Sequence, residues 1–98
     1  MESKYDQKII GTMGKQEKLL IQILNGQSDA NINFHDLLSL MNGLGFDKRV
    51  SGSHHILRKE GILEKINLQK EENKAKPYQI RQVRNIILKY KLGVKSNG

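Results

Sequence analysis

The stretch Phe46–Leu57 reads FDKRVSGSHHIL, and it decides the fold. Side chains alternate in character from Phe46 to Val50, with Phe46, Lys48 and Val50 on one side, as expected for a strand. Ser51–Ser53 is a turn signal centred on a glycine. We therefore predict strands at residues 46–50 and 54–59 that pair as an antiparallel hairpin, because short turns join antiparallel neighbours.

Further signals on both sides of the hairpin predict the rest of an α+β fold. Beyond a Glu60-Gly61 turn, Ile66 and Leu68 mark a third strand over residues 64–69, which completes an antiparallel meander. Before the hairpin, apolar residues recur at helical spacing after Asn33, a plausible N-cap: Phe34, Leu37, Leu38, Met41 and Leu44.

A second helix is predicted after the sheet, with Pro77 in its first turn, where a missing N–H is tolerated. Its apolar stripe is Ile80, Val83, Ile87 and Tyr90, and residues 70–76 before it are expected to form a charged loop. Helices must cover one face of the sheet, because three strands cannot bury themselves alone.

The N-terminal third adds one more helix, Gln16–Asn25, ended by Gly26 as a left-handed cap. A polar loop, residues 27–32, follows it. We predict a flexible tail at 1–14, a single domain at 15–92 and a second flexible tail at 93–98. How the added helix packs is left open: it extends the core, contacts a partner or crosses the sheet.

Composition bounds the function. The 98 residues carry a net charge of +7 and include no cysteine, which excludes disulfides and thiol catalysis. Residues 1–45 have a net charge of −1 and residues 46–98 a net charge of +8, so the excess positive charge lies in the second half. Such a surface attracts phosphates or serves only solubility. No apolar run is long enough to span a membrane, and we expect a cytoplasmic protein.

The adjacent histidines His54 and His55 are the candidate chemical groups. Neighbours on a strand point to opposite faces, so the two rings are poorly placed to chelate one metal ion. His35 lies apart, at a helix start, and no metal or cofactor is expected. Either strand histidine could instead be half-buried in the core.

His54 follows a Gly-Ser turn at an accessible strand end, close in sequence to Arg58, Lys59 and Lys65. An imidazole among cations suits acid–base chemistry on a phosphodiester. RNA supplies its own nucleophile, the 2′-hydroxyl, whereas DNA has none. If the site cleaves a nucleic acid, RNA is therefore the favoured substrate.

Several motifs in order resemble the HicA family of bacterial toxins. They are Gly52–Ile56 (GSHHI), Arg58–Gly61 (RKEG), Ile66–Gln69 (INLQ) and Lys74–Val83 (KAKPYQIRQV). The resemblance runs over about residues 33–90; the tail and helix that precede Asn33 depart from the compact family pattern.

The resemblance implies a double-stranded-RNA-binding-like fold, α-β-β-β-α, with helices on one face of a three-stranded antiparallel sheet. It also implies a ribosome-independent mRNA interferase, neutralised by a HicB-type antitoxin, in which His54 is catalytic and His55 is not.

Residue roles follow as expectations. Gly52 and Ser53 shape the turn that presents His54, and Ser53 bonds a phosphate or is an ordinary turn hydroxyl. The remaining RNA-binding candidates are cations, some of them before the last helix, where a helix N-terminus attracts phosphate: Arg58, Lys59, Lys74, Lys76 and Arg81. Arg84 is expected to face solvent or RNA. Tyr78 stacks on a base or covers the sheet edge, and we favour packing.

Two other readings stay open. One is a module of the same fold that holds double-stranded RNA without cutting it, since duplex RNA is recognised by shape and 2′-hydroxyl contacts that need no histidine. The other is a DNA-binding accessory protein. Cleavage of RNA in EDTA would distinguish the ribonuclease from both of these alternatives.

Overall fold

A three-stranded antiparallel sheet forms one layer of the computed structural model, which describes residues 14–93. The strands are β1 (Asp47–Ser51), β2 (His54–Arg58) and β3 (Ile66–Leu68), paired in the order β1-β2-β3. His55 lies opposite Val50 on one side and Leu68 on the other. The predicted meander is confirmed, although β1 begins and ends one residue later than predicted, and β2 and β3 are shorter than the predicted strands.

Gly52 and Ser53 form the two-residue turn between β1 and β2. Gly52 has a φ of 60°, whereas Ser53 is not among the residues of positive φ. A positive φ at only the first central position is the pattern of type II′ hairpins, which favour glycine there. The turn keeps β1 and β2 in register and leaves His54 as the first residue of β2.

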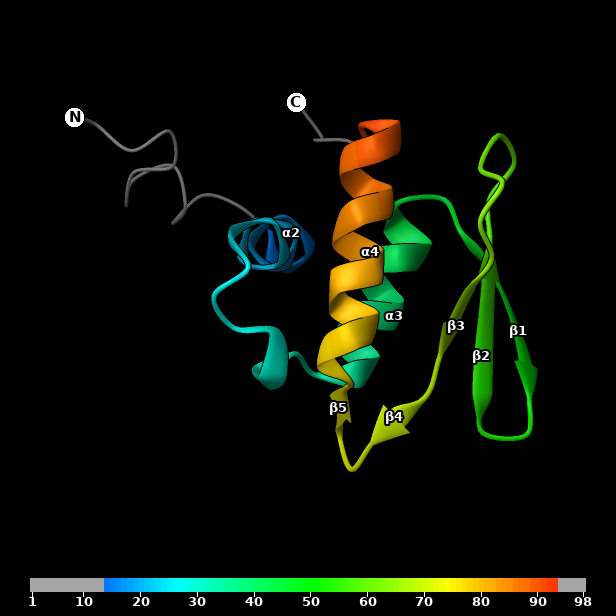
Figure 1. The fold of residues 1–98 in the computed structure, drawn as a ribbon, viewed down its shortest axis with the longest axis horizontal. Helices are drawn as coiled ribbons and strands as arrows, with labels where there is room; N and C mark the ends of the chain where they lie inside the picture. The colour runs from blue at the N-terminus through cyan, green and yellow to red at the C-terminus, as the bar shows by residue number, and fades with distance from the viewer. Residues whose placement is uncertain (1–13, 94–98) are drawn as a thin grey trace.

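Two helices cover one face of the sheet, as Figure 1 shows. Helix α3 (Phe34–Gly43) begins at Asn33, whose side-chain oxygen accepts a hydrogen bond from the Asp36 backbone N–H at 3.0 Å. Helix α4 (Pro77–Tyr90) begins at Pro77. The predicted cap and the predicted proline position are both confirmed.

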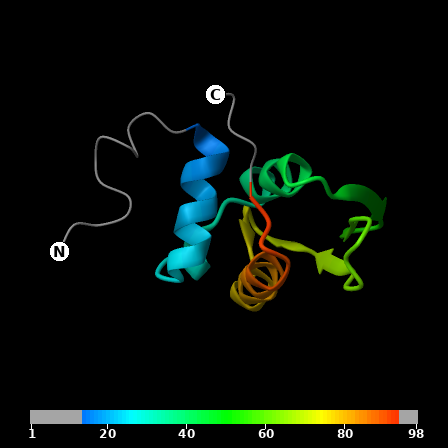
Figure 2. The same cartoon turned by 90° about the horizontal axis from the view of Figure 1, so that it is seen from above.

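The core lies between these two helices and the inner face of the sheet. Its fully buried side chains come from both helices and from β2 and β3, and they include Phe34, Leu37, Leu57, Ile66, Leu68, Ile80 and Val83. Leu57 is buried and Arg58 is exposed, as the strand alternation requires. The opposite face of the sheet has no helix over it in either view (Figures 1 and 2).

The additional helix, α2 (Lys15–Asn25), lies on the side of α3 and α4 that is away from the sheet (Figure 2). It contacts both helices, and its Ile23 is fully buried. Gly26 ends it with a φ of 72°, the predicted left-handed cap. Of the alternatives raised by the sequence, the structure shows that α2 extends the core and does not cross the sheet.

Two segments predicted as loops contain short regular structure. Residues 29–31 form a 3-10 turn, η1 (Asp29–Asn31), and residues 70–75 form a small hairpin of β4 (Lys70–Glu71) and β5 (Lys74–Ala75). The hairpin is held because the Ala75 N–H donates to the Ile32 carbonyl at 2.9 Å. A run of charged residues with one buried alanine gave no strand pattern to detect.

Within residues 14–93, no helix is both long enough and apolar enough to cross a membrane. The predicted tails, 1–14 and 93–98, lie outside the described residues apart from Gly14 and Gly93.

Candidate active site

The two adjacent histidines point to opposite faces of β2. His54 is exposed, on the same face of the strand as Ile56 and Arg58. His55 is half-buried beneath the sheet, where its ring meets Phe34 edge-on with centroids 5.0 Å apart. Burial, and then the nearby Lys48 ammonium, lower the pKa of His55. His55 is therefore a packing residue, as the strand alternation suggested, and His54 is the histidine open to a ligand.

Asn67 of β3 holds the His54 ring. His54 Nδ1 lies 3.1 Å from Asn67 Oδ1, across the antiparallel pair. An amide oxygen only accepts hydrogen bonds, so this contact assigns the ring proton to Nδ1. The Nε2 atom of a neutral His54 then carries the free lone pair, which is the state that a general base needs.

The turn before His54 is hydrogen-bonded to Gln69, the residue that follows β3. Gln69 Nε2 donates to Ser53 Oγ at 3.0 Å. The amide of Gln79 is buried, with only 1% of the residue exposed. In the orientation that satisfies both of its polar atoms, the Gln79 amide donates to the Gln69 carbonyl at 3.2 Å and accepts from the Gln69 N–H at 3.1 Å. Helix α4 thereby fixes the end of β3, against which the turn rests.

Sequence reasoning missed Gln69, Gln79 and Asn67. Gln79 adjoins the apolar stripe of α4 and reads as an exposed helix residue. Gln69 and Asn67 read as ordinary strand residues. A polar residue next to a helix stripe was the one available signal, and it is too common to identify a site.

A groove of about 270 Å³ runs between β3 and α4, beside His54. Besides His54 and Asn67, the side chains that line it include Lys65, Gln69, Tyr78 and Gln82. Tyr78 is 56% exposed, so the prediction that we favoured, packing over the sheet edge, is wrong. The ring lies in the first turn of α4 and lines the groove that Asn67 and Gln69 also line, so it is open to a ligand.

A second hollow, of about 420 Å³, lies on the open face of the sheet. Arg49, Arg58 and Lys65 line it, together with Asp47. Lys65 lines both hollows, so a basic surface reaches from this face to the groove at His54. Of the predicted cations, Arg58 shares the His54 face, four residues and roughly 13 Å along the strand.

Other predicted RNA-binding residues lie elsewhere. Lys59 follows β2 and its ammonium lies against Gly45, in the turn after α3. Lys74 donates to Asn31 Oδ1 at 3.2 Å, and Lys76 is the N-cap of α4. The groove at His54 is not lined by any of these three lysines, nor by Arg81.

The expectation for Arg84 is wrong. Its guanidinium forms a two-pronged ion pair with Asp29, with Nη2 2.7 Å from Oδ2, and both side chains are largely buried. Arg84 Nη1 also donates to the Ile23 carbonyl at 3.4 Å. Arg84 joins α4 to η1 and α2, and its guanidinium is engaged in contacts within the protein. Arg81, three residues earlier, is exposed.

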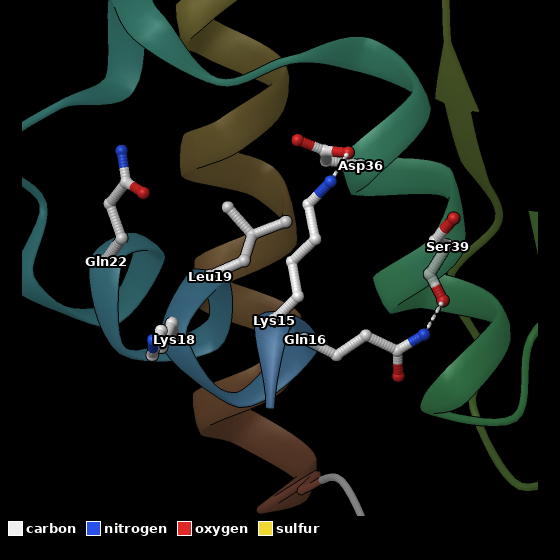
Figure 3. A pocket seen from close by; sticks show the side chains of 7 residues that line it. All are labelled: Lys15, Gln16, Lys18, Leu19, Gln22, Asp36 and Ser39. Carbon is white, nitrogen blue, oxygen red and sulfur yellow. Dashed lines mark hydrogen bonds and ion pairs between the residues drawn. The ribbon is translucent and has the colours of Figure 1, made fainter. Parts of the chain in front are cut away.

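A separate hollow of about 410 Å³ lies between α2 and α3 (Figure 3). Four of its polar residues are engaged with one another: Lys15 pairs with Asp36 at 3.0 Å, and Gln16 donates to the Ser39 carbonyl at 3.0 Å. No histidine lines it. This hollow is larger than the groove at His54, but only the groove presents the exposed His54 imidazole.

Among residues 14–93, no three side chains of the His, Asp and Glu types come together as a metal site would require. The groove offers one imidazole, one ammonium, four amides and a tyrosine ring. This set can bind an anion and exchange a proton with it.

Comparisons with known proteins identify no relatives. No protein-family model matches the chain, and neither the curated proteins nor the solved structures include a significant match.

Proposed function

We propose that this protein is a HicA-type toxin: an mRNA interferase that cleaves RNA without a metal, using His54 as its general acid–base group. The observation that carries the proposal is the contact of His54 Nδ1 with Asn67 Oδ1, at 3.1 Å, beside a groove that also holds Lys65. The contact leaves Nε2 free at an exposed position. Exposure, orientation and a neighbouring cation are what acid–base chemistry on a phosphodiester needs.

The proposed reaction needs only groups that RNA and His54 supply. His54 Nε2 accepts the proton of a 2′-hydroxyl as that oxygen attacks the adjacent phosphorus. The bond from phosphorus to the 5′-oxygen breaks, and the departing oxygen takes a proton from the imidazolium or from water. The products are a 2′,3′-cyclic phosphate and a free 5′-hydroxyl. Lys65 stabilises the charge that develops on the phosphate oxygens.

The fold supports the same proposal from a separate direction. The order α3-β1-β2-β3-α4, with both helices on one face of the sheet, agrees with the double-stranded-RNA-binding-like arrangement that the resemblance implies. The basic open face, with Arg49, Arg58 and Lys65, supplies a path for a phosphate backbone.

A HicB-type antitoxin is the proposed partner, acting in the cytoplasm. An unrestrained ribonuclease would harm its own cell, and the simplest restraint is a protein that covers His54 and the basic face beside it. Opposite charge speeds such an association. Co-expression of the partner should restore growth, and Arg58→Glu should weaken the complex. A complex that binds RNA as tightly as the free protein would show that occlusion is not the mechanism.

The test is incubation of the purified protein with labelled single-stranded RNA in EDTA, followed by analysis of the product ends. Cleavage that yields 2′,3′-cyclic phosphate supports the proposal. A gel shift of duplex RNA without cleavage would instead indicate the non-catalytic RNA-binding module. Preference for duplex DNA would indicate the DNA-binding accessory protein.

A further inference from the structure

Tyr78 is an exposed aromatic residue in an otherwise polar groove. Its residue surface is 56% exposed, although it occupies the second position of α4, next to the buried Gln79 and Ile80. The helix that carries it is fixed by the Gln79 amide on the Gln69 backbone. The ring is thus held on a rigid element at the wall of the groove that contains His54.

The groove also presents side chains that have no bonding partner among residues 14–93. Within residues 14–93, the side chains of Gln82, Lys65 and Tyr78 form no hydrogen bond or ion pair. Asn67 uses its amide oxygen on His54 and retains its amide nitrogen as a donor. The groove therefore combines one flat aromatic ring with the Gln82 amide and the Lys65 ammonium, which have no partner among residues 14–93.

A nucleobase matches this combination. Every base has a face that stacks on an aromatic side chain, and an edge whose donors and acceptors pair with amides. The hollow, at about 270 Å³, lies just below the ~300–1,000 Å³ usual for small-molecule pockets. A hollow of this size is of the order needed for a single base.

We infer that the groove between β3 and α4 binds one unstacked nucleobase of single-stranded RNA, next to the phosphodiester on which His54 acts. The inference rests on the proposed function and names its substrate class. Tyr78 stacks on the base, Gln82 contacts its edge, and Lys65 binds the phosphate that joins it to the next nucleotide. A base in a duplex is paired and stacked, and so it cannot enter.

Binding can be measured without cleavage by using 2′-O-methyl oligoribonucleotides, which lack the nucleophile. The probe is a single-stranded oligomer with one 2-aminopurine, whose fluorescence reports stacking; its duplex form is the comparison. Tyr78→Ala should weaken binding of the single strand by about 5- to 150-fold, the effect of losing one base–aromatic stack. Tyr78→Phe should bind as the unmodified protein does.

Leu88→Ala is the matched control. Leu88 is on the same helix and 59% exposed, close to Tyr78 in exposure, and does not line the groove. It should leave the affinity for the single strand unchanged. Gln82→Ala should alter the order of preference among homopolymeric oligomers, which loss of a phosphate contact would not do.

The inference would be overturned if Tyr78→Ala bound the single strand with unchanged affinity, or if it lost equal affinity for single strand and duplex. It would also be overturned if the unmodified protein did not bind the single strand. The cleavage assay in EDTA separates these from failure of the proposed function. If the unmodified protein cleaves RNA but Tyr78→Ala binds the single strand with normal affinity, the proposed function stands and the base-binding groove is refuted.

Discussion

His54 Nδ1 and Asn67 Oδ1 are 3.1 Å apart, on neighbouring strands whose residues are thirteen positions apart in the chain. The contact fixes both the rotation of the imidazole and the nitrogen that carries its proton. Asn67 is thus a positioning residue for a catalytic histidine, in the proposal made here. Its role is testable because an amide and a carboxylate have nearly the same shape.

Asn67→Asp should keep the hydrogen bond and place a negative charge against the ring. A carboxylate stabilises the imidazolium, so the acidic limb of the pH–rate profile for RNA cleavage should move to higher pH. Asn67→Leu should lower the rate without that displacement. A profile that is identical in Asn67→Asp and the unmodified protein would show that Asn67 does not act on His54.

Arg84 is expected to matter for stability and not for RNA. Removing one partner of a largely buried ion pair strands the other charge, so Arg84→Ala should lower the free energy of unfolding by about 2–3 kcal/mol. The exposed Arg81, on the same helix, is the matched control, and Arg81→Ala should change stability by less than about 0.5 kcal/mol. Urea denaturation measures both; equal stability of the two variants would contradict the assignment.

Glu64 should make stability depend on acid pH. Lys89 Nζ and the Tyr90 hydroxyl donate to its carboxylate at 2.8 and 2.5 Å, and these bonds lower its pKa to about 2. Because the folded-state pKa lies below the ordinary value, the stabilisation is present above about pH 4.5 and is lost as pH falls toward 2.

Thermal unfolding at several pH values tests this. Between pH 4.5 and pH 2, the melting temperature of the unmodified protein should fall further than that of Glu64→Gln. Glu60→Gln, at an exposed turn position, should behave as the unmodified protein does. Parallel curves for all three proteins would refute the role of Glu64.

Arg49 and Arg58 on the open face should set the salt dependence of RNA binding. Each phosphate contact to a single strand contributes a slope of about 0.7 in log K against log salt. Replacing both arginines with glutamine should flatten that slope by about 1.4. Lys74 and Lys76, which do not line either basic hollow, should have a smaller effect when replaced together. A larger change of slope on replacing Lys74 and Lys76 than on replacing Arg49 and Arg58 would place the RNA path at the start of α4.

Local signals explain which parts of the fold the sequence predicts. The Asn33 cap, the helical stripe after it and the glycine turn at Gly52 each depend on neighbours a few residues apart, and each is found. The β4–β5 hairpin was missed because it depends on the distant contact of Ala75 with Ile32.

The same contrast between local signals and distant contacts holds for the candidate site. Strand alternation predicts that His54 and His55 part to opposite faces. It carries no information on Asn67, nor on the pairing of Arg84 with Asp29, 55 residues away in the chain. The Asn67 contact arises only when β3 pairs with β2, and the Arg84 pair only when α4 packs against η1. Exposed positions on α4 therefore could not be told from buried ones by charge alone.

The central claim is that His54 is the general acid–base group of a metal-independent ribonuclease. The most direct measurement is the single-turnover rate of RNA cleavage in EDTA for His54→Ala and for His35→Ala. His35 is an exposed histidine on α3 that does not line the groove. We expect His54→Ala to lose about 10²–10⁴-fold in rate, with its fold retained by circular dichroism, and His35→Ala to keep full activity. A folded His54→Ala protein that cleaves at the unmodified rate would contradict the account.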